Sequence, residues 1–320
     1  MPFDPSGLLI LDKTSGPTSH DLCRKVRRLY GTRKVGHTGT LDPFATGVMV
    51  VLLGKATRLA RYFNDDAKEY VADVAWGSAT DTADRDGAVT ERTDVPLPDE
   101  VAIREAMAKF VGFIDQIPPM YSAKKVQGQK LHQLARRGEK IDREAVRVRI
   151  DELELLSRTD GGFRLRVACS KGTYIRTLAE DLCRALGGLG HLASLRRTRA
   201  GRFTIDAARD VAELEEAAEE AWNDTGIAEA RERVLTDALM PMLDALAHLP
   251  AIVLPDALAE GVAFGKRPPR ERLPERAATL TGDVRLLDSN GRFLATGRVG
   301  TGDTEVELVR VLVTPDGETT

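Results

Sequence analysis

The distribution of apolar residues predicts several short strands in the first half of the chain. Residues 7–11 and 48–53 are unbroken apolar runs of a length typical of buried strands. In residues 70–76, alternate positions, beginning with a tyrosine and ending with a tryptophan, form one apolar face, which is the pattern of a half-buried strand. Two further strands are predicted at 146–155 and 163–169.

Three helices are predicted among these strands from helical spacing and from capping residues. The first follows Thr18 or Ser19, either of which can cap it, and repeats leucine and valine at i, i+4 and i+7. The second begins after Asp99 and runs to about Phe110, and the third covers about 173–186. Since strands and helices do not alternate as βαβ units, we expect an α+β fold rather than a doubly wound sheet.

An acidic segment at 206–248 is rich in alanine, glutamate and leucine and is predicted to be helical. Four of its leucines recur at helical spacing: Leu235, Leu239, Leu243 and Leu246. As an acidic helical surface, this segment should avoid a polyanion, and a packing or spacer role is the default expectation.

The composition changes near residue 250, where we place a domain boundary. Residues 284–288 and 292–296 flank a Ser-Asn-Gly sequence, which is a strong hairpin signal. A third strand at 305–313 completes a small β-rich module. The chain is therefore predicted to comprise a larger domain, 1–249, and a smaller one, 250–320.

Charge is distributed unevenly, although the formal net charge of the 320 residues is only -3. The sequence gives net charges of +6 for residues 1–62 and +10 for residues 120–205, against -9 for residues 206–250. Two basic blocks around an acidic one suit a protein with a polyanion-binding face. Two separate solvated basic surfaces would produce the same pattern, so charge suggests a partner without identifying it.

Several classes of protein are disfavoured by features that the sequence lacks. Cys23, Cys169 and Cys183 form neither a CxxC pair nor a Cys/His cluster, so we expect small core residues rather than a metal site or a disulfide framework. No apolar run approaches the roughly 20 residues of a membrane helix. The first residues lack the basic and apolar regions of a signal peptide, and we expect a cytoplasmic protein.

Residues 36–47 (GHTGTLDPFATG) carry the strongest chemical signal. Their three glycines and one proline predict a tight loop whose backbone can approach a ligand closely. The loop presents one carboxylate, Asp42, between Leu41 and Pro43, an arrangement that can hold a nucleophile in one orientation. A structural Asp that caps a turn before the next strand would look the same locally.

This loop resembles the G-H-x-G-x-L-D-P-x-A-x-G block of the bacterial tRNA pseudouridine-55 synthases, the TruB family, in which the block carries the catalytic aspartate. Further blocks of the family occur in the same order across residues 8–205. They are LILDKTSGPTS at 9–19, KEY at 68–70, DTADRDG at 81–87, PPMYSAKK at 118–125, SKGTYIR at 170–176 and HLASLRR at 191–197.

The resemblance implies a pseudouridine-synthase fold, with a mixed, largely antiparallel sheet, and a set of catalytic residues. It implies that Asp42 is the nucleophile, that Tyr70 stacks on the uracil and can accept its C5 proton, and that Arg176 lies against Asp42 and keeps it ionised. It also implies that Tyr174 and Leu195 form walls of the uracil pocket. Without the resemblance, these side chains would be ordinary core or surface residues.

The same resemblance suggests residues that bind the substrate outside the pocket. His37 is implied to help hold an extruded RNA loop. Lys13, the basic residues at 24–28 and those at 124–125 are candidate phosphate contacts, although each could be an ordinary surface charge. Asp84 could orient a basic residue of the cleft or could simply form a turn.

The activity implied is isomerisation of uridine to pseudouridine in the T-arm loop of tRNA, at position 55. Such a reaction leaves the redox state and the atoms unchanged, so no cofactor and no metal is expected. The module after residue 250 resembles the PUA domain, an RNA-binding module, whereas the acidic segment 206–248 departs from what the family leads us to expect.

We expect a monomer that acts on tRNA without a membrane or a guide RNA. Two alternatives remain: archaeal and eukaryotic relatives use a guide RNA and partner proteins, and a tRNA-binding chaperone would use the same basic face without chemistry.

Overall fold

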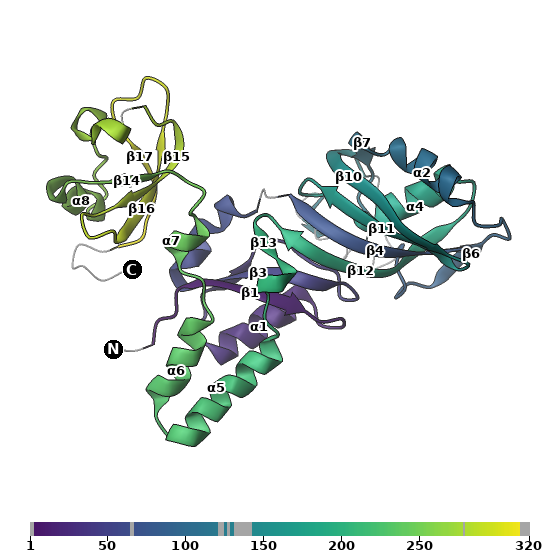
Figure 1. Cartoon of the computed structure of the whole chain (residues 1–320), viewed down its shortest axis with the longest axis horizontal. Helices are drawn as coiled ribbons and strands as arrows, with labels where there is room; N and C mark the ends of the chain where they lie inside the picture. Colours follow the sequence, from purple (N-terminus) through teal and green to yellow (C-terminus); the bar gives the residue numbers. More distant parts are fainter. Residues whose placement is uncertain are drawn as a thin grey trace.

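A long sheet, a helical hairpin and a small second sheet make up the chain in the computed structural model (Figure 1). The structure describes residues 3–64, 67–120, 125–126, 129–130, 143–277 and 279–313. Within them, no helix is both long and apolar enough to cross a membrane.

Among the described residues the long sheet has nine strands, and its hydrogen-bonded path runs through seven of them. In spatial order these are β1 (Gly7–Lys13), β3 (Thr46–Leu53), β12 (Gly190–Ala200), β4 (Lys68–Trp76), β11 (Gly162–Cys169), β10 (Val146–Thr159) and β7 (Gly112–Gln116). The short strands β2 (Val35–His37) and β13 (Phe203–Thr204) pair with β3 and β12. Neighbours are antiparallel except β3 and β12, which are parallel. The expected α+β fold with a mixed, largely antiparallel sheet is confirmed.

Strands β1 and β3 are buried on both faces, as their unbroken apolar runs predicted. Alternate residues enter two different cores, so that Leu9 packs in one and Leu8 in the other. The first core includes residues of the helices α1 (Ser19–Leu29), α2 (Glu100–Ala108) and α4 (Ile175–Ala185), and residues of the acidic segment also join it. The predicted helices are confirmed, and all three cysteines are buried core residues.

The outer face of β4, β11 and β12 is polar and laced by ion pairs. Arg164 contacts Asp73 at 2.6 Å, and Arg166 contacts Glu69 at 3.3 Å. Such half-exposed pairs add little stability each, but they keep this face soluble while the other face carries the core.

The helix predicted to follow Thr18 or Ser19 is capped by Thr18. Its hydroxyl accepts a hydrogen bond from the backbone N–H of Asp21, whose carboxylate accepts one from the backbone N–H of Thr18 in return. This capping box sets where α1 begins. Asp99 caps α2 in the predicted place.

The acidic segment forms a hairpin of α5 (Val211–Thr225) and α6 (Ala228–Asp237), which turns at Gly226. Its predicted helical character is confirmed, but the four leucines at helical spacing do not share one helix, because Leu235 lies in α6 and the other three follow its end. The chain leaves the helix after Asp237 because Met240 exchanges two backbone hydrogen bonds with Leu8 of β1. The short helix α7 (Met242–Ala245) then starts after Pro241.

The chain from residue 251 forms the second sheet. Its strands are β14 (Ala251–Val253), β15 (Gly282–Leu287), β16 (Phe293–Val299) and β17 (Glu307–Val311), with α8 (Asp256–Ala263) beside them. The predicted hairpin is β15–β16, and the predicted third strand is β17. Sequence patterns missed β14, whose three residues pair in parallel with β15.

The two sheets share a hydrophobic core. Leu287, Phe293 and Leu312 of the second sheet region belong to the same buried cluster as Leu8 and Leu52 of the long sheet. A polar link reinforces it, since the Arg58 guanidinium donates a hydrogen bond to the carbonyl of Val311. Because the two sheets bury apolar side chains against each other, separating them would expose apolar surface on both.

We therefore predict that Leu312→Ala lowers the free energy of unfolding of the whole chain by about 2–4 kcal/mol, because Leu312 is fully buried in the shared core. Urea unfolding followed by circular dichroism and tryptophan fluorescence should show one common transition at lower urea. Val253→Ala, at a half-exposed position of β14, is the control and should change stability by less than about 1 kcal/mol. A separate early transition that spares the long sheet would contradict the shared core.

Candidate active site

The loop that carries Asp42 is hydrogen-bonded to α1 through the side chain of Ser19. The Ser19 hydroxyl donates a hydrogen bond to the carbonyl of Leu41 (3.0 Å) and accepts one from its backbone N–H (2.9 Å). Ser19 is buried, so these bonds are shielded from water. The residue just before the carboxylate is therefore fixed on both of its backbone polar groups.

Lys13, at the end of β1, holds the same loop from inside. Its ammonium donates to the carbonyl oxygens of Asp42 (3.2 Å), Pro43 (3.0 Å) and Ala45 (2.8 Å). Only 1% of Lys13 is exposed. Burial lowers the pKa of Lys13 to about 8, Asp42 opposes this effect and Arg197 adds to it.

Gly47 joins the loop to β3 at a position where only glycine fits. Its φ is +104°, and a Cβ built there would lie 2.2 Å from the carbonyl oxygen of Arg197. Gly47 and Arg197 are paired in the parallel contact between β3 and β12. The glycine thus lets the loop enter the sheet beside β12.

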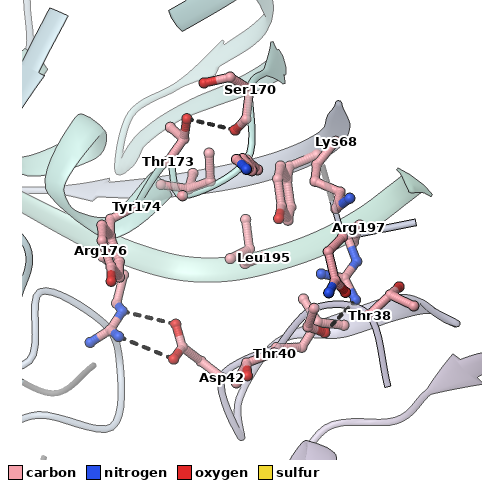
Figure 2. Close-up of a pocket in the computed structure, with 17 residues that line it drawn as sticks. Thr38, Thr40, Asp42, Lys68, Ser170, Thr173, Tyr174, Arg176, Leu195 and Arg197 are labelled. Carbon is pink, nitrogen blue, oxygen red and sulfur yellow. Dashed lines mark hydrogen bonds and ion pairs between the residues drawn. The ribbon is translucent and has the colours of Figure 1, made fainter. Parts of the chain in front are cut away.

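Asp42 faces Arg176, which stands in the first turn of α4 (Figure 2). The two side chains form a fork: Nε of Arg176 lies 2.9 Å from Oδ2 of Asp42, and Nη2 lies 3.1 Å from Oδ1. A two-bonded fork fixes the direction of a carboxylate as well as its charge. Arg176 is 3% exposed, whereas about a third of the Asp42 side chain is exposed.

The far side of the Arg176 guanidinium is held by the loop between β5 (Ser78–Thr80) and β6 (Val89–Arg92). Nη1 donates to the carbonyl of Thr82 (2.8 Å) and lies 3.4 Å from a carboxylate oxygen of Asp84. Asp84 is itself buried and accepts hydrogen bonds from the Thr82 hydroxyl (2.6 Å) and the backbone N–H of Asp86 (3.1 Å).

These charges act on the pKa of Asp42 in opposite directions. Burial raises the pKa of this carboxyl, the charge of Arg176 lowers it, and the nearby carboxylate of Asp84 raises it. Lys13 contributes a smaller lowering effect. The ionised form of Asp42 therefore depends on Arg176 above all.

Asp42 opens into a cavity of about 240 Å³. Tyr70, Tyr174 and Leu195 line it together with Asp42 and Arg176. Figure 2 shows Leu195 between the ion pair at one end and Lys68 and Arg197 at the other. A space of this size, with apolar walls and charged ends, suits a small planar ring that carries polar groups.

Gln116, at the end of β7, fixes the turn that presents Tyr174. Its side-chain amide donates to the carbonyl of Tyr174 (3.2 Å), and its amide oxygen accepts from the backbone N–H of Tyr174 (3.0 Å). Gln116 is 1% exposed. It therefore fixes both backbone polar groups of Tyr174, which stands at the N-cap position of α4, two residues before Arg176.

Tyr70 is buried. Burial raises the pKa of Tyr70, whereas the charge of Arg197 and a hydrogen bond with Arg197 lower it. The hydroxyl is therefore neutral at neutral pH.

The structure brings five of the eight predicted site residues to one cavity. They are Asp42, Tyr70, Tyr174, Arg176 and Leu195. The other three, Lys13, His37 and Asp84, are not among the residues that line it.

His37 lies in β2, half-buried, beside the loop. Its Nδ1 is buried and has no hydrogen-bond partner among the described residues. Burial lowers the pKa of His37, and Arg197 and His20 add to this effect. Its expected contact with RNA stays a prediction.

Several side chains expected to contact phosphates have partners within the protein. Lys13 faces inward, because a 1% exposed ammonium that donates to loop carbonyls has no surface left for a phosphate. In α1, Lys25 pairs with Glu215 at 2.8 Å and Arg27 donates to the carbonyl of Val35, so much of the basic stripe serves the fold. Residue 124 lies outside the described residues, and the structure does not describe the side chain of residue 125.

Sequence reasoning missed several residues that shape the site. Ser19 was considered only as a cap, and Gln116 gave no signal. Lys68 and Arg197 stood inside family blocks, but only their neighbours were singled out. The basic pair at 196–197 was a usable signal, because two arginines in one strand must point to opposite faces, one of them toward the core.

Two family models match adjacent parts of the chain, which together cover more than half of it. The description "TruB family pseudouridylate synthase (N terminal domain)" covers residues 27–175, and "tRNA pseudouridylate synthase B C-terminal domain" covers residues 176–247. The second range includes α5 and α6, so the expectation that the acidic segment departs from the family was wrong.

Curated relatives and solved structures agree with these matches. The chain is 42% identical to a tRNA pseudouridine synthase B of Azoarcus sp. strain BH72, over 98% of this chain and 96% of the relative. It is 44% identical to one of Chromohalobacter salexigens, over 82% and 81%. Its fold matches a chain in "Crystal Structure of a Cbf5-Nop10-Gar1 Complex" with TM-score 0.73 and 28% identity, over 97% of this chain and 86% of that one.

The buried ammonium of Lys13 leads to a prediction about stability. Lys13→Met should lower the free energy of unfolding by roughly 3 kcal/mol at pH 7, because it leaves buried carbonyls without a donor. The folded pKa is about 8 against an ordinary value of 10.5. Between these values the unfolded chain binds more protons, so the contribution of Lys13 to stability rises with pH.

The difference in the free energy of unfolding between wild type and Lys13→Met should therefore widen above pH 8, by up to about 1.4 kcal/mol per pH unit. Urea unfolding at pH 7.0, 8.5 and 9.5 measures it. Lys25→Met, which removes a half-exposed ammonium, is the control with a constant difference. A constant difference for Lys13→Met would refute the lowered pKa.

Proposed function

This chain belongs to the TruB family of tRNA pseudouridine synthases, and from that premise we propose that it converts the uridine at position 55, in the T-arm loop of tRNA, to pseudouridine. Asp42 acts as the nucleophile on a flipped-out uridine. The observation that carries this proposal is the fork between Asp42 and the buried Arg176 at one end of a cavity with aromatic and aliphatic walls.

The target base has to leave its stack to reach Asp42. A uracil within folded RNA is stacked, and an enzyme that acts on its glycosidic bond must extrude it. The cavity of about 240 Å³ offers Tyr70 for stacking and Leu195 and Tyr174 as further walls. Extrusion is least costly from a loop, which agrees with a T-arm substrate.

In the reaction, the N1–C1′ bond is replaced by a C5–C1′ bond. Asp42 adds at C1′ of the ribose or at C6 of the base, or assists elimination, and the freed uracil rotates and rejoins through C5. Each route uses an ionised, correctly directed carboxylate. Arg176 supplies the positive charge and the direction, since both of its donors meet the two oxygens of Asp42.

Asp84 acts as a positioning residue for Arg176. It is buried on the opposite side of the guanidinium from Asp42 and is itself held by hydrogen bonds. The guanidinium is therefore clamped between two carboxylates and the carbonyl of Thr82. This clamp keeps the fork from rotating away from the nucleophile.

Other parts of the chain bind the tRNA outside the cavity. The second sheet, which resembles a PUA domain, binds the acceptor stem, and His37 and exposed basic residues hold the T-arm. The enzyme works without a guide RNA, in keeping with its length match to bacterial relatives. A tRNA-chaperone activity would use the same contacts with tRNA and would be retained when Asp42 is replaced.

We predict that the purified protein converts one T-loop uridine of an unmodified tRNA transcript to pseudouridine without any added cofactor. Asp42→Asn should lower the single-turnover rate by at least roughly 10⁴-fold, because the amide is not a nucleophile. Chemical labelling of pseudouridine followed by sequencing locates the product. Binding of the transcript, measured by filter retention, should change less than about 10-fold.

Asp160→Asn, at the exposed turn between β10 and β11, is the matched control and should retain activity. No product from wild-type protein on a folded transcript would overturn the stand-alone enzyme and leave a guide-dependent enzyme or a binding protein. Normal activity of Asp42→Asn would overturn the assignment of the nucleophile.

A second prediction follows from the pKa of Asp42, which burial raises and Arg176 lowers. Because the ionised carboxylate is the reactive form, activity should rise with pH along an acid limb. Arg176→Gln removes the lowering effect, so this limb should move to higher pH, with activity at pH 7 reduced by about 10²–10³-fold and partly restored at higher pH. Single-turnover rates from pH 5 to 9 measure it.

Arg184→Gln removes an exposed guanidinium from the same helix, where it pairs with Glu180, and should leave the limb in place. An acid limb that does not move in Arg176→Gln would show that Arg176 does not control the ionisation of Asp42.

A further inference from the structure

Arg197 connects the two halves of the site through the sheet. In β12 it lies directly opposite Tyr70 of β4, and on its other side it is paired with Gly47, where the nucleophile's loop enters β3. Directly opposite residues of an antiparallel pair point to the same face, with Cβ atoms about 5 Å apart. Both side chains line the cavity that contains Asp42.

The guanidinium of Arg197 is held rigidly by neutral groups. It is 2% exposed, and it donates to the carbonyls of Val48 (2.7 Å) and Gly39 (3.2 Å). Among the described residues, no carboxylate lies within ion-pair distance of it. Burying a charge without a counter-charge is costly. Its positive charge is therefore available to whatever occupies the cavity.

One group of the same cavity that can use this charge is the Tyr70 hydroxyl. Arg197 lies opposite Tyr70 in the sheet, and its charge lowers the pKa of Tyr70 against the effect of burial. The other charged or titratable groups around Tyr70 are Cys169 of β11, Asp42 of the loop, and four residues that line the same cavity: Lys68, Lys171, Tyr174 and Arg176. Cys169 and Asp42 make a phenolate less favourable, and Arg197 makes it more favourable.

We propose that Arg197 is a positioning residue that holds the Tyr70 hydroxyl beside the nucleophile's loop and lets it take the C5 proton of the base. This inference rests on the proposed function. A neutral phenol in an apolar enclosure cannot accept a proton, so Tyr70 needs an adjacent fixed cation to act as a base.

The proton transfer balances as follows. Tyr70 first releases its own proton to water, and Arg197 stabilises the phenolate. The C5–H bond of the rejoined base then breaks, its proton moves to the Tyr70 oxygen, and its electron pair restores the C5–C6 double bond. The ring nitrogen N1, freed from the sugar, takes up one proton, so that no atom is gained or lost.

The test compares Arg197→Gln with wild type on two T-arm RNAs, one with uridine and one with 5-fluorouridine at the target. The fluorinated base has no C5 proton to lose. We expect Arg197→Gln to form pseudouridine about 10²-fold more slowly at pH 7.5, with a rate that continues to rise at higher pH than in wild type. Consumption of the 5-fluorouridine RNA, and binding of both RNAs, should stay within about three-fold of wild type.

Arg196→Gln is the matched control on the same strand. Arg196 points to the other face, where it pairs with Asp12 at 2.6 Å, and its loss should not move the pH profile. Equal losses of Arg197→Gln on both RNAs, with an unmoved pH profile, would overturn the proposal and leave a purely structural arginine.

Arg197→Lys covers the case in which Arg197→Gln does not fold. It keeps the charge, so its pH profile should match that of wild type, with a loss of at most about 10-fold on uridine RNA. An equal loss of this variant on both RNAs would also overturn the proposal. Failure of the proposed function has a different signature, because the wild-type protein itself would then form no pseudouridine from the uridine RNA.

Discussion

The charge of the buried Arg176 is met by carboxylates on two sides, and the site is organised around this arrangement. Its guanidinium meets Asp42 on one side and Asp84 and the Thr82 carbonyl on the other. A buried ion pair of this kind adds little net stability, because desolvation offsets its attraction. What it provides is direction: the carboxylate of Asp42 cannot rotate away while the fork is in place, and the charge of Arg176 opposes the rise in its pKa that burial causes.

The backbone beneath the fork is made equally rigid by inward-facing polar side chains. Ser19 and Lys13 bind the loop from α1 and from the end of β1, and Gln116 binds the turn that begins α4. Each comes from a different element, so the loop is held at several points by parts of the chain far apart in sequence. Hydrogen bonds of this kind, which hold the backbone on either side of the fork, keep the side chains of the fork in a narrow range of positions.

Register in the sheet determines which side chains meet in the cavity. The parallel contact between β3 and β12 places Arg197 beside Gly47, and the antiparallel contact with β4 places Arg197 opposite Tyr70. A slip of one residue would turn each of these side chains to the polar outer face. The ion pairs on that outer face, such as Arg164 with Asp73, therefore help to keep the catalytic face in register.

The sequence by itself determined the elements whose cause is local. Apolar runs predicted the strands at 7–11 and 48–53, a cap predicted the start of α1, and a glycine-rich loop around one aspartate identified Asp42. Its resemblance to a family also named Tyr70 and Arg176, which the structure brings to one cavity.

Tertiary structure alone decided the surroundings of the charges. Lys13 looked like a phosphate contact, yet its ammonium is enclosed by loop carbonyls. Nothing in the local sequence separated Arg197 from Arg196, although one lies in the cavity and the other pairs with Asp12 on the far face. The reason is physical: residue type sets the charge that a side chain carries, while its burial, partners and pKa depend on strands that meet only after folding.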